Sequence, residues 1–498
     1  MILKSISYVT VGLILGRVFS FIKHAIIVKY AGISYSADIF FLANTIPETI
    51  INVMIAGMLT GAFIPLASQI LAKNGSSAFK KFINNSFYFL GAGLLILAGI
   101  LFVFAGKFSL LLAPGYNHQD QYLVANILKI FSPGVLFIGM AALLTGTLQS
   151  LEKFLVPSFG LFLANLTTIL FIIFYFKEYG IYSAAIGTSF GFFLWFIYQI
   201  PFTFKYIIPP VWLNFKSKDL RHLLHLTLPT MIVISISNFT LVLEKIYATN
   251  LQVGTITQLN LAFRLTLIFS SILIIPLSTV LLPKMSKEYA KNNLDDLHDI
   301  VTTTFLIVST LLFIVVIFIV INAQTIARII YSPLGISNNS FLQIADFLRI
   351  YSLSFFGLFF YPIILRIFFA VQKVKYLVQA SILGFIIYNV FVLLLISLLG
   401  SYVLPLAYGI FYWTIVTFLF RMMKKNIFTK RPIILNKLIF MIGFLFTSVA
   451  VLYLYLMMNV NIELHIQLIV TTILIVPLLI LLRKYISGIT ISKNIGTR

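Results

Sequence analysis

The segment P-L-A-S-Q-I-L-A-K-N at residues 65–74 returns in the second half of the chain as P-K-M-S-K-E-Y-A-K-N at residues 283–292. The proline, serine, alanine, lysine and asparagine stand at the same spacing in both copies. Each copy lies at the polar end of a long apolar stretch, and these stretches are the second and the eighth along the chain. An even number of membrane crossings separates them, so the repeat predicts two parallel lobes related by an axis along the membrane normal.

The composition requires that these lobes lie in a lipid bilayer. The chain has 498 residues, of which 60% are hydrophobic and 10% charged, with a mean hydropathy of +1.06. Soluble domains average about 45–50% apolar and about 25% charged residues, so a water-soluble globule is excluded. A span needs about 20 apolar residues, and about fourteen stretches qualify: 5–30, 36–70, 82–106, 122–149, 155–176, 181–204, 221–248, 258–282, 300–322, 341–371, 376–398, 402–420, 435–459 and 463–482.

We therefore predict an all-α polytopic membrane protein with two parallel six-helix lobes around a central cavity. The N-lobe takes residues 1–215 and the C-lobe residues 216–430, while 431–498 add two helices and a basic cytoplasmic tail. We read the first apolar stretch as a retained helix, not a signal peptide, because no small-residue cleavage site follows it. Repeated lobes of this kind are typical of alternating-access transporters, which hold their ligand near the middle of the membrane.

The net charge of +22, from 35 Lys and Arg against 13 Asp and Glu, is an orientation signal. With the N-terminus in the cytoplasm, most loop cations face inward, and the outer loops keep only Lys29, Lys107, Lys177 and Arg328. This distribution satisfies the positive-inside rule and predicts that both termini lie on the cytoplasmic side of the membrane. It also removes the reason to expect a nucleic-acid partner.

Several kinds of chemistry find no support. The chain has no cysteine, which excludes disulfides and thiol catalysis. It contains no phosphate-binding Walker loop, dinucleotide glycine fingerprint or H-E-x-x-H motif, so we expect neither ATP hydrolysis nor a metal or other cofactor. His222 and His225 are expected to be solvated, not metal ligands. A membrane-embedded glycosyltransferase is the alternative among enzymes. Such enzymes usually need a catalytic carboxylate in a large outer loop, and the longest outer loops predicted here contain only Asp120 among carboxylates.

Ionisable residues inside the apolar stretches mark the candidate site. Arg17 lies in the middle of stretch 5–30, where an unsatisfied charge costs about 2.5–3.5 kcal/mol. His24 follows seven residues later on nearly the same helical face, and Lys23 precedes it. Arg264 lies in the other lobe, so both lobes supply cations suited to a phosphate or diphosphate.

A structural alternative stays open, in which Asp38 pairs with Lys23 or Arg17. In the same alternative, Glu244 pairs with Arg264 or Lys245. A second hypothesis assigns Glu244 and Asn389 to a coupling ion, either by binding Na⁺ or by carrying a proton. The role of Glu48, in the middle of stretch 36–70, is left undecided by the sequence.

Three motifs resemble the MurJ (MviN) lipid II flippases of the multidrug/oligosaccharidyl-lipid/polysaccharide exporter superfamily: G-R-V-F-S-F-I-K-H-A-I-I-V-K-Y-A-G from Gly16, A-D-I-F-F-L-A-N-T-I-P from Ala37 and G-A-F-I-P from Gly61. Shorter matches continue through L-N-L-A-F-R-L, T-V-L-L-P-K-M-S-K and R-I-F-F-A. The resemblance implies fourteen helices and substrate-binding roles for a set of polar residues at positions matching the family's cavity residues: Arg17, Lys23, His24, Asp38 and Arg264.

The chain departs from the family pattern at three places. Residues Ile50–Gly57 read I-I-N-V-M-I-A-G, without the family's arginine pair and glutamate, and Lys23-His24 stand where the family has Arg-Asp. Glu244 stands where the family usually has Asp.

The resemblance implies a flippase that moves a polyprenyl-diphosphate-linked cell-wall precursor, lipid II or a relative, by alternating access. Its partners would be that lipid-linked glycan, membrane lipids and cell-wall synthases. A negative-inside potential favours outward movement of an anion by about 2.3 kcal/mol per charge per 100 mV, so the potential, Na⁺ or H⁺ could supply direction. Three alternatives stay open: a flippase for an O-antigen or exopolysaccharide unit, an ion-coupled drug antiporter of the same superfamily, and a non-transporting scaffold.

Overall fold

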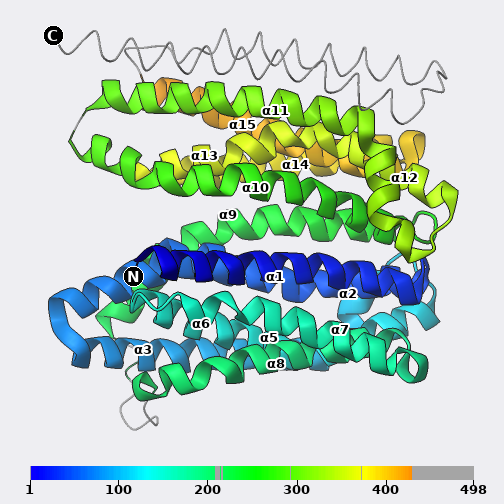
Figure 1. The fold of residues 1–498 in the computed structure, drawn as a ribbon, viewed down its shortest axis with the longest axis horizontal. Coiled ribbons are helices and arrows are strands. Elements are labelled where there is room, and N and C mark those ends of the chain that lie inside the picture. The colour runs from blue at the N-terminus through cyan, green and yellow to red at the C-terminus, as the bar shows by residue number, and fades with distance from the viewer. Residues whose placement is uncertain (1, 208–213, 215–216, 292, 372, 429–498) are drawn as a thin grey trace. The chain divides into compact units, whose positions relative to one another are not determined.

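The computed structural model describes residues 2–207, 214, 217–291, 293–371 and 373–428, and every regular element within them is a helix (Figure 1). The elements follow one another in this order: α1 (Ile2–Ala31), α2 (Tyr35–Asn52), η1 (Val53–Phe63), α3 (Ile64–Val103), α4 (Ala105–Leu112), α5 (His118–Ser150), α6 (Leu155–Ser158), α7 (Gly160–Tyr179), α8 (Ile181–Thr203), η2 (Phe204–Tyr206), α9 (Lys218–Ala248), α10 (Thr255–Ala290), α11 (Leu294–Tyr331), η3 (Ser332–Leu334), α12 (Asn338–Tyr351), η4 (Ser352–Ser354), α13 (Phe355–Ala370), α14 (Lys375–Leu399), η5 (Gly400–Tyr402) and α15 (Val403–Asn426).

The predicted all-helical membrane fold is confirmed. Nine helical segments in the described part of the chain are long and apolar enough to cross a membrane. Each predicted stretch from 5–30 to 402–420 coincides with one of the described helices or with a run of them. Helices are expected because a bilayer offers no water to unpaired backbone groups, and a helix satisfies them within one segment. The predicted stretches 435–459 and 463–482 lie outside the described residues.

The repeated segment lies at comparable helix ends in the two halves. The helical run through α2, η1 and the start of α3 is interrupted at Gly75, whose φ of 78° and ψ of −179° are non-helical. This positive φ is costly for residues with a Cβ, so glycine suits the break that separates two predicted stretches. The second copy, residues 283–292, lies at the end of α10, which finishes at Ala290.

The segment that departs from the family pattern forms a wide helix. Val53–Phe63 is a π-helix, and the N–H of Ile64 donates to the carbonyl of Leu59, five residues back. π-Helices are rare and are found mostly as single turns at functional sites. Just before this one, Asn52 donates through Nδ2 to Oδ1 of Asn238 on α9 at 2.7 Å.

Small residues let the helices around α1 approach closely. A Cβ on Gly16 of α1 would lie 3.3 Å from the Leu161 side chain, and a Cβ on Gly191 of α8 would overlap the backbone of Ala164 on α7. Asn165 on α7 donates to the Gly16 carbonyl at 3.2 Å. Close contact through small residues and interhelical hydrogen bonds is how membrane helices associate, and here it fixes α1 against α7.

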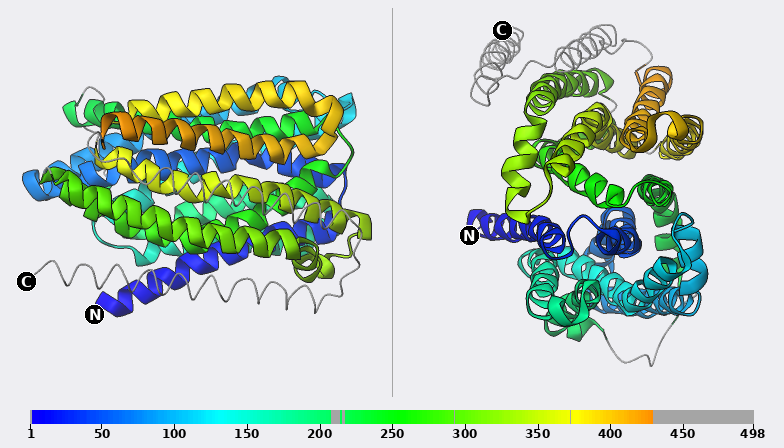
Figure 2. Two further views of the ribbon diagram at one scale, coloured as in Figure 1. Left: turned by 90° about the horizontal axis from the view of Figure 1, so that it is seen from above. Right: turned by 90° about the vertical axis from the view of Figure 1, so that its right-hand side faces the viewer.

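The chain divides into two compact units. The first comprises Met1–Asn260 with Pro333–Ile336, and the second comprises Leu261–Ser332 with Ser337–Arg498, of which 292, 372 and 429–498 are not described. In the first unit, α1, α2, α5, α7 and α8 run side by side (Figures 1 and 2). The first unit includes α9, which the repeat assigns to the C-lobe. The repeat divides the chain by similarity of sequence, whereas the two units are defined by compactness. The lobe boundary at 215/216 therefore stays a prediction.

The second unit has an aromatic core. Phe305 on α11 contacts Phe360 on α13 and Phe420 on α15, with ring centroids 5.5 and 5.1 Å apart. The buried Tyr331 hydroxyl donates to the Leu261 carbonyl on α10 at 2.9 Å. These contacts tie α10, α11, α13 and α15 together.

Candidate functional site

Among the described residues of the first unit, the buried Asp, Glu, Lys and His side chains lie on α1, α2 and α9. On α1, Lys23 is 6% exposed and His24 is 1% exposed, whereas Arg17, two turns earlier, is exposed. The predicted polar side of this helix therefore exists, and at Lys23 and His24 it is packed against protein. Burying charged groups is costly unless they find partners, so their contacts decide what the cluster can do.

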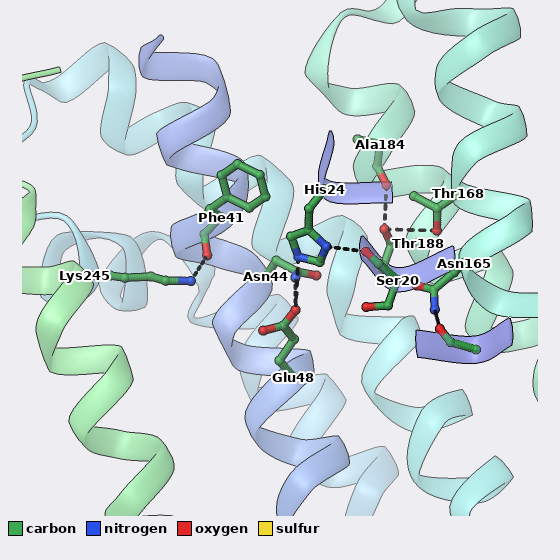
Figure 3. Close-up of polar contacts among 11 residues, drawn as sticks. Ser20, His24, Phe41, Asn44, Glu48, Asn165, Thr168, Ala184, Thr188 and Lys245 are labelled. Carbon is green, nitrogen blue, oxygen red and sulfur yellow. Dashed lines mark hydrogen bonds and ion pairs between the residues drawn. The ribbon is translucent and has the colours of Figure 1, made fainter. Parts of the chain in front are cut away.

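His24 is held between α1 and α2 (Figure 3). Its Nδ1 lies 2.6 Å from the Ser20 carbonyl, and its Nε2 lies 3.5 Å from Oε1 of Glu48. Asn44, one turn before Glu48 on α2, donates through Nδ2 to the same Oε1 at 3.0 Å. The Phe41 ring stacks on the imidazole with centroids 5.5 Å apart and planes 6° apart. The contacts with His24 and Asn44 show that Glu48 is paired in the structure, whereas the sequence left its role undecided.

Asp38 caps the start of α10. Its buried carboxylate accepts hydrogen bonds from Gly254 N at 2.6 Å, Thr257 N at 2.7 Å and Thr257 Oγ1 at 2.5 Å. The first N–H groups of a helix have no intrahelical acceptor, and a carboxylate there also complements the helix dipole. The hydrogen bonds of Asp38 that the structure describes thus go to α10, and the alternative pairing of Asp38 with Lys23 or Arg17 stays a prediction.

The same end of the unit contains Tyr116, in the loop between α4 and α5. Its ring meets that of Tyr35 edge to face, with centroids 5.5 Å apart. Burial raises the pKa of the Tyr116 phenol, and the charge of Asp38 adds to this effect. The head of α2 is therefore a closely packed corner, not an open surface.

The last turn of α9 contributes a buried cation and a buried anion. Lys245 donates through Nζ to the Phe41 carbonyl on α2 at 2.8 Å, and it acts electrostatically on Asp38 (Figure 3). Glu244 precedes it and is also buried. Lys245 therefore fastens α9 to α2 at the residue whose ring stacks on His24.

The remaining predicted site residues lie in the second unit. Arg264 is half-buried on α10, where its charge acts on the phenol of Tyr331. Asn389 is half-buried on α14 and donates through Nδ2 to the Phe385 carbonyl at 2.8 Å. Glu244 lies in the first unit and Asn389 in the second, so the coupling-ion assignment stays a prediction. The substrate-binding assignment of Arg17, Lys23, His24, Asp38 and Arg264 stays a prediction too.

Among the described charged side chains of this cluster that are buried, cations and anions occur in equal number. The buried cations Lys23 and Lys245 are matched by the buried anions Asp38 and Glu244. Arg17 and Lys29 are the cations of α1 whose described side chains are exposed. Asp38 and Lys245 therefore tie helices together, whereas the exposed Arg17 and Lys29 are accessible to an anion from outside.

Sequence reasoning missed Asn44 and the backbone partners of Asp38 and Lys245. Asn44 and Glu48 stand four residues apart, which places them on one helical face, and this spacing was a usable signal. The backbone partners give no such signal, because almost every residue has an N–H and a carbonyl.

The fold defines the class of the protein as a multi-pass helical membrane protein, and a solved transporter of the MOP superfamily shares this fold. An inward-facing MATE family multidrug-resistance transporter of that superfamily superposes with a TM-score of 0.70 at 15% identity, covering 86% of this chain and 99% of its own. A structure described as "Lipid II flippase MurJ, inward closed conformation" superposes with a TM-score of 0.77 at 23% identity, covering 96% of this chain and 99% of its own. At these identities the superpositions show the fold alone.

The sequence comparisons identify the family. The family model described as lipid II flippase MurJ matches residues 27–473, so the chain belongs to the MurJ lipid II flippase family. The probable lipid II flippase MurJ of Buchnera aphidicola subsp. Acyrthosiphon pisum is 25% identical over 392 residues, 76% of each protein. That of Buchnera aphidicola subsp. Schizaphis graminum is 28% identical over 301 residues, so the match spans 58% of that relative's length.

Proposed function

We propose that the chain is a flippase that carries a lipid II-like, polyprenyl-diphosphate-linked cell-wall precursor across the bacterial inner membrane. The observation that carries this proposal is the family match over residues 27–473, joined to a multi-pass helical fold. The absence of an ATP-binding motif agrees with a carrier that uses an existing gradient. Both termini are proposed to lie in the cytoplasm, on the strength of the loop cations.

In this proposal the lipid tail stays in the bilayer while the diphosphate and sugars pass through the protein. Arg17 and Arg264 are the proposed diphosphate contacts, because guanidinium groups bind paired phosphate oxygens bidentately. Their half-exposed or exposed state leaves them able to meet such a ligand. Glu244 and Asn389 are the proposed coupling-ion groups, and cell-wall synthases that consume the outer-leaflet product are the proposed partners.

Leaflet-resolved translocation in proteoliposomes tests the proposal. Purified protein is reconstituted with fluorescent lipid II, and outer-leaflet substrate is measured with and without an imposed potential. We expect translocation of lipid II, and a faster rate when the potential drives the anion along the transport direction. Parallel vesicles carry an O-antigen-type lipid-linked unit with the same diphosphate. Transport of that unit without lipid II would move the assignment to the other glycan, and transport of neither would refute it.

A further inference from the structure

The histidine and glutamate that join α1 to α2 face each other in a way that demands a proton. His24 Nδ1 lies 2.6 Å from the Ser20 carbonyl oxygen. A carbonyl oxygen only accepts hydrogen bonds, so Nδ1 must carry the hydrogen of this contact. The other nitrogen, Nε2, faces Oε1 of Glu48 at 3.5 Å.

With Nδ1 protonated, the neutral imidazole presents a lone pair at Nε2. An ionised Glu48 would present a second lone pair, and two acceptors facing each other repel. One additional proton removes the repulsion, either on Nε2, which makes a His⁺–Glu⁻ ion pair, or on the carboxyl group, which then faces neutral Nε2. The Asn44 amide also donates to Oε1 at 3.0 Å, but it leaves the imidazole lone pair where it is.

We propose that His24 and Glu48 together bind one proton, and that this proton holds α1 against α2. When the proton leaves for water, the pair becomes a neutral imidazole and a carboxylate, and the attraction between the two helices at this point becomes a repulsion. The inference concerns a proton site in this chain and does not rest on the proposed function.

Exposure defines where the proton enters and leaves. The His24 side chain is 1% exposed, whereas the Glu48 side chain is 29% exposed. The Phe41 ring covers one face of the imidazole. Exchange therefore occurs through the Glu48 carboxyl group, and His24 receives the proton from it.

Other charged groups lie on α1 and α2 and on the helices that pack against them. α1 packs against α2, α6, α7 and α8, and α2 packs in turn against α5, α8, α9 and η1. α6 and α8 carry no charged residue, and on α7 the charges are exposed at one end. Among described side chains of α1, α2, α5, α7 and the last turn of α9, the charged or titratable residues of the Asp, Glu, His, Lys and Arg types other than the pair are Arg17, Lys23, Lys29, Asp38, His118, Asp120, Lys129, Lys177, Glu178, Glu244 and Lys245.

Two of these residues need separate attention. Asp38 is the other acid of α2, and its oxygens are engaged by the start of α10. Lys23 adjoins His24 in sequence, but a helix turns about 100° per residue, so it leaves the helix in another direction. The test below identifies the signals of His24 and Glu48 individually, so that a change at Asp38 or Lys23 is not mistaken for the pair.

The first experiment measures the proton directly on the full chain in lipid nanodiscs, without substrate. Imidazole ¹⁵N shifts report the protonation of histidine, and the infrared carboxyl band that is missing in Glu48→Gln reports Glu48. His24→Asn identifies the His24 resonance, and His222→Asn, at an exposed position on α9, is the matched control. In the parent we expect the two reporters to change together over one pH range.

Each single substitution should uncouple the remaining group. In Glu48→Gln, the proton concentration at the His24 midpoint should move by tenfold or more, and His222→Asn should leave it within twofold of the parent. A shift of less than threefold in Glu48→Gln, or reporters that change independently in the parent, would overturn the shared proton.

The second experiment tests the link to helix packing. The chain has no cysteine, so Val18→Cys on α1 and Gln69→Cys on α3, both exposed, give one defined pair of spin labels. We expect their distance distribution to change across the pH range of the pair, and to be insensitive to pH in the Glu48→Gln background. If the spin-label distance distribution does not change when the proton is lost, the proposal that this proton controls the position of α1 is overturned. Lack of lipid II transport in the separate vesicle assay would leave both results valid.

Discussion

Asp38→Ala removes the acceptor that holds the start of α10. The carboxylate accepts from two backbone N–H groups, those of Gly254 and Thr257, and from the Thr257 hydroxyl. A buried donor left without an acceptor costs about 1–3 kcal/mol. The hydroxyl can rotate to another acceptor, so the two backbone donors set the scale, and the expected loss of unfolding free energy is about 2–6 kcal/mol. Asp38→Asn keeps one carbonyl oxygen and should lose about half as much.

The assay is SDS-induced unfolding in mixed micelles, followed by far-UV circular dichroism. Asp219→Ala is the matched control, because Asp219 is an exposed carboxylate in the first turn of α9, where a helix-dipole contact is worth about 0.3–1 kcal/mol. If Asp38→Ala loses no more stability than Asp219→Ala, the capping argument is refuted. The conservative Asp38→Asn variant then separates structure from transport. A loss of translocation far beyond its loss of stability would support the predicted contact with substrate.

Three further predictions use matched pairs. Arg17→Ala should lower lipid II translocation in proteoliposomes tenfold or more, because it removes a bidentate phosphate contact, whereas the exposed Arg328→Ala should change it less than twofold; equal effects would contradict the proposed site. Arg264→Ala should reduce translocation by a similar factor while leaving circular dichroism unchanged, and loss of helical signal would count against a binding role. Gly160→Ala should cost about 1–3 kcal/mol, because its Cβ would overlap an indole ring, whereas Gly93→Ala meets open space and should stay within about 1 kcal/mol in the same SDS assay.

The fold could be predicted from the sequence because the bilayer imposes both length and secondary structure. Apolar stretches of about 20 residues with polar breaks leave few alternatives to a bundle of spanning helices. Local departures from a regular α-helix were harder to predict from the sequence. The stretch 341–371 looks like one helix, but a 3₁₀ turn at Ser352–Ser354 divides it into α12 and α13. The π-helix at Val53–Phe63 has an ordinary apolar sequence, since its wider turn depends on the helices packed around it.

The site was partly predictable, and the difference has a physical cause. Charged side chains in apolar stretches stand out, so Lys23, His24, Asp38 and Glu244 could be singled out and are indeed buried. Their partners could not be predicted equally well. Asp38 binds backbone N–H groups more than 200 residues away, at Gly254 and Thr257. A donor that every residue except proline possesses leaves no mark in the sequence, so only the folded chain shows the contact.

The fully buried charges on α1, α2 and α9, two cations and two anions among the described side chains, narrow the role of the buried cations in ligand binding. An anionic headgroup gains from a cation only if the cation is not already committed, since displacing a buried partner leaves that partner uncompensated. Lys245 is committed to the Phe41 carbonyl and acts on Asp38, which is itself committed to α10. Arg17 is exposed and lies about two turns from His24 on the same helix. A proton that fastens α1 at His24 would therefore also set the position of the cation best placed to bind a diphosphate, which connects the proton site to ligand binding through one rigid helix.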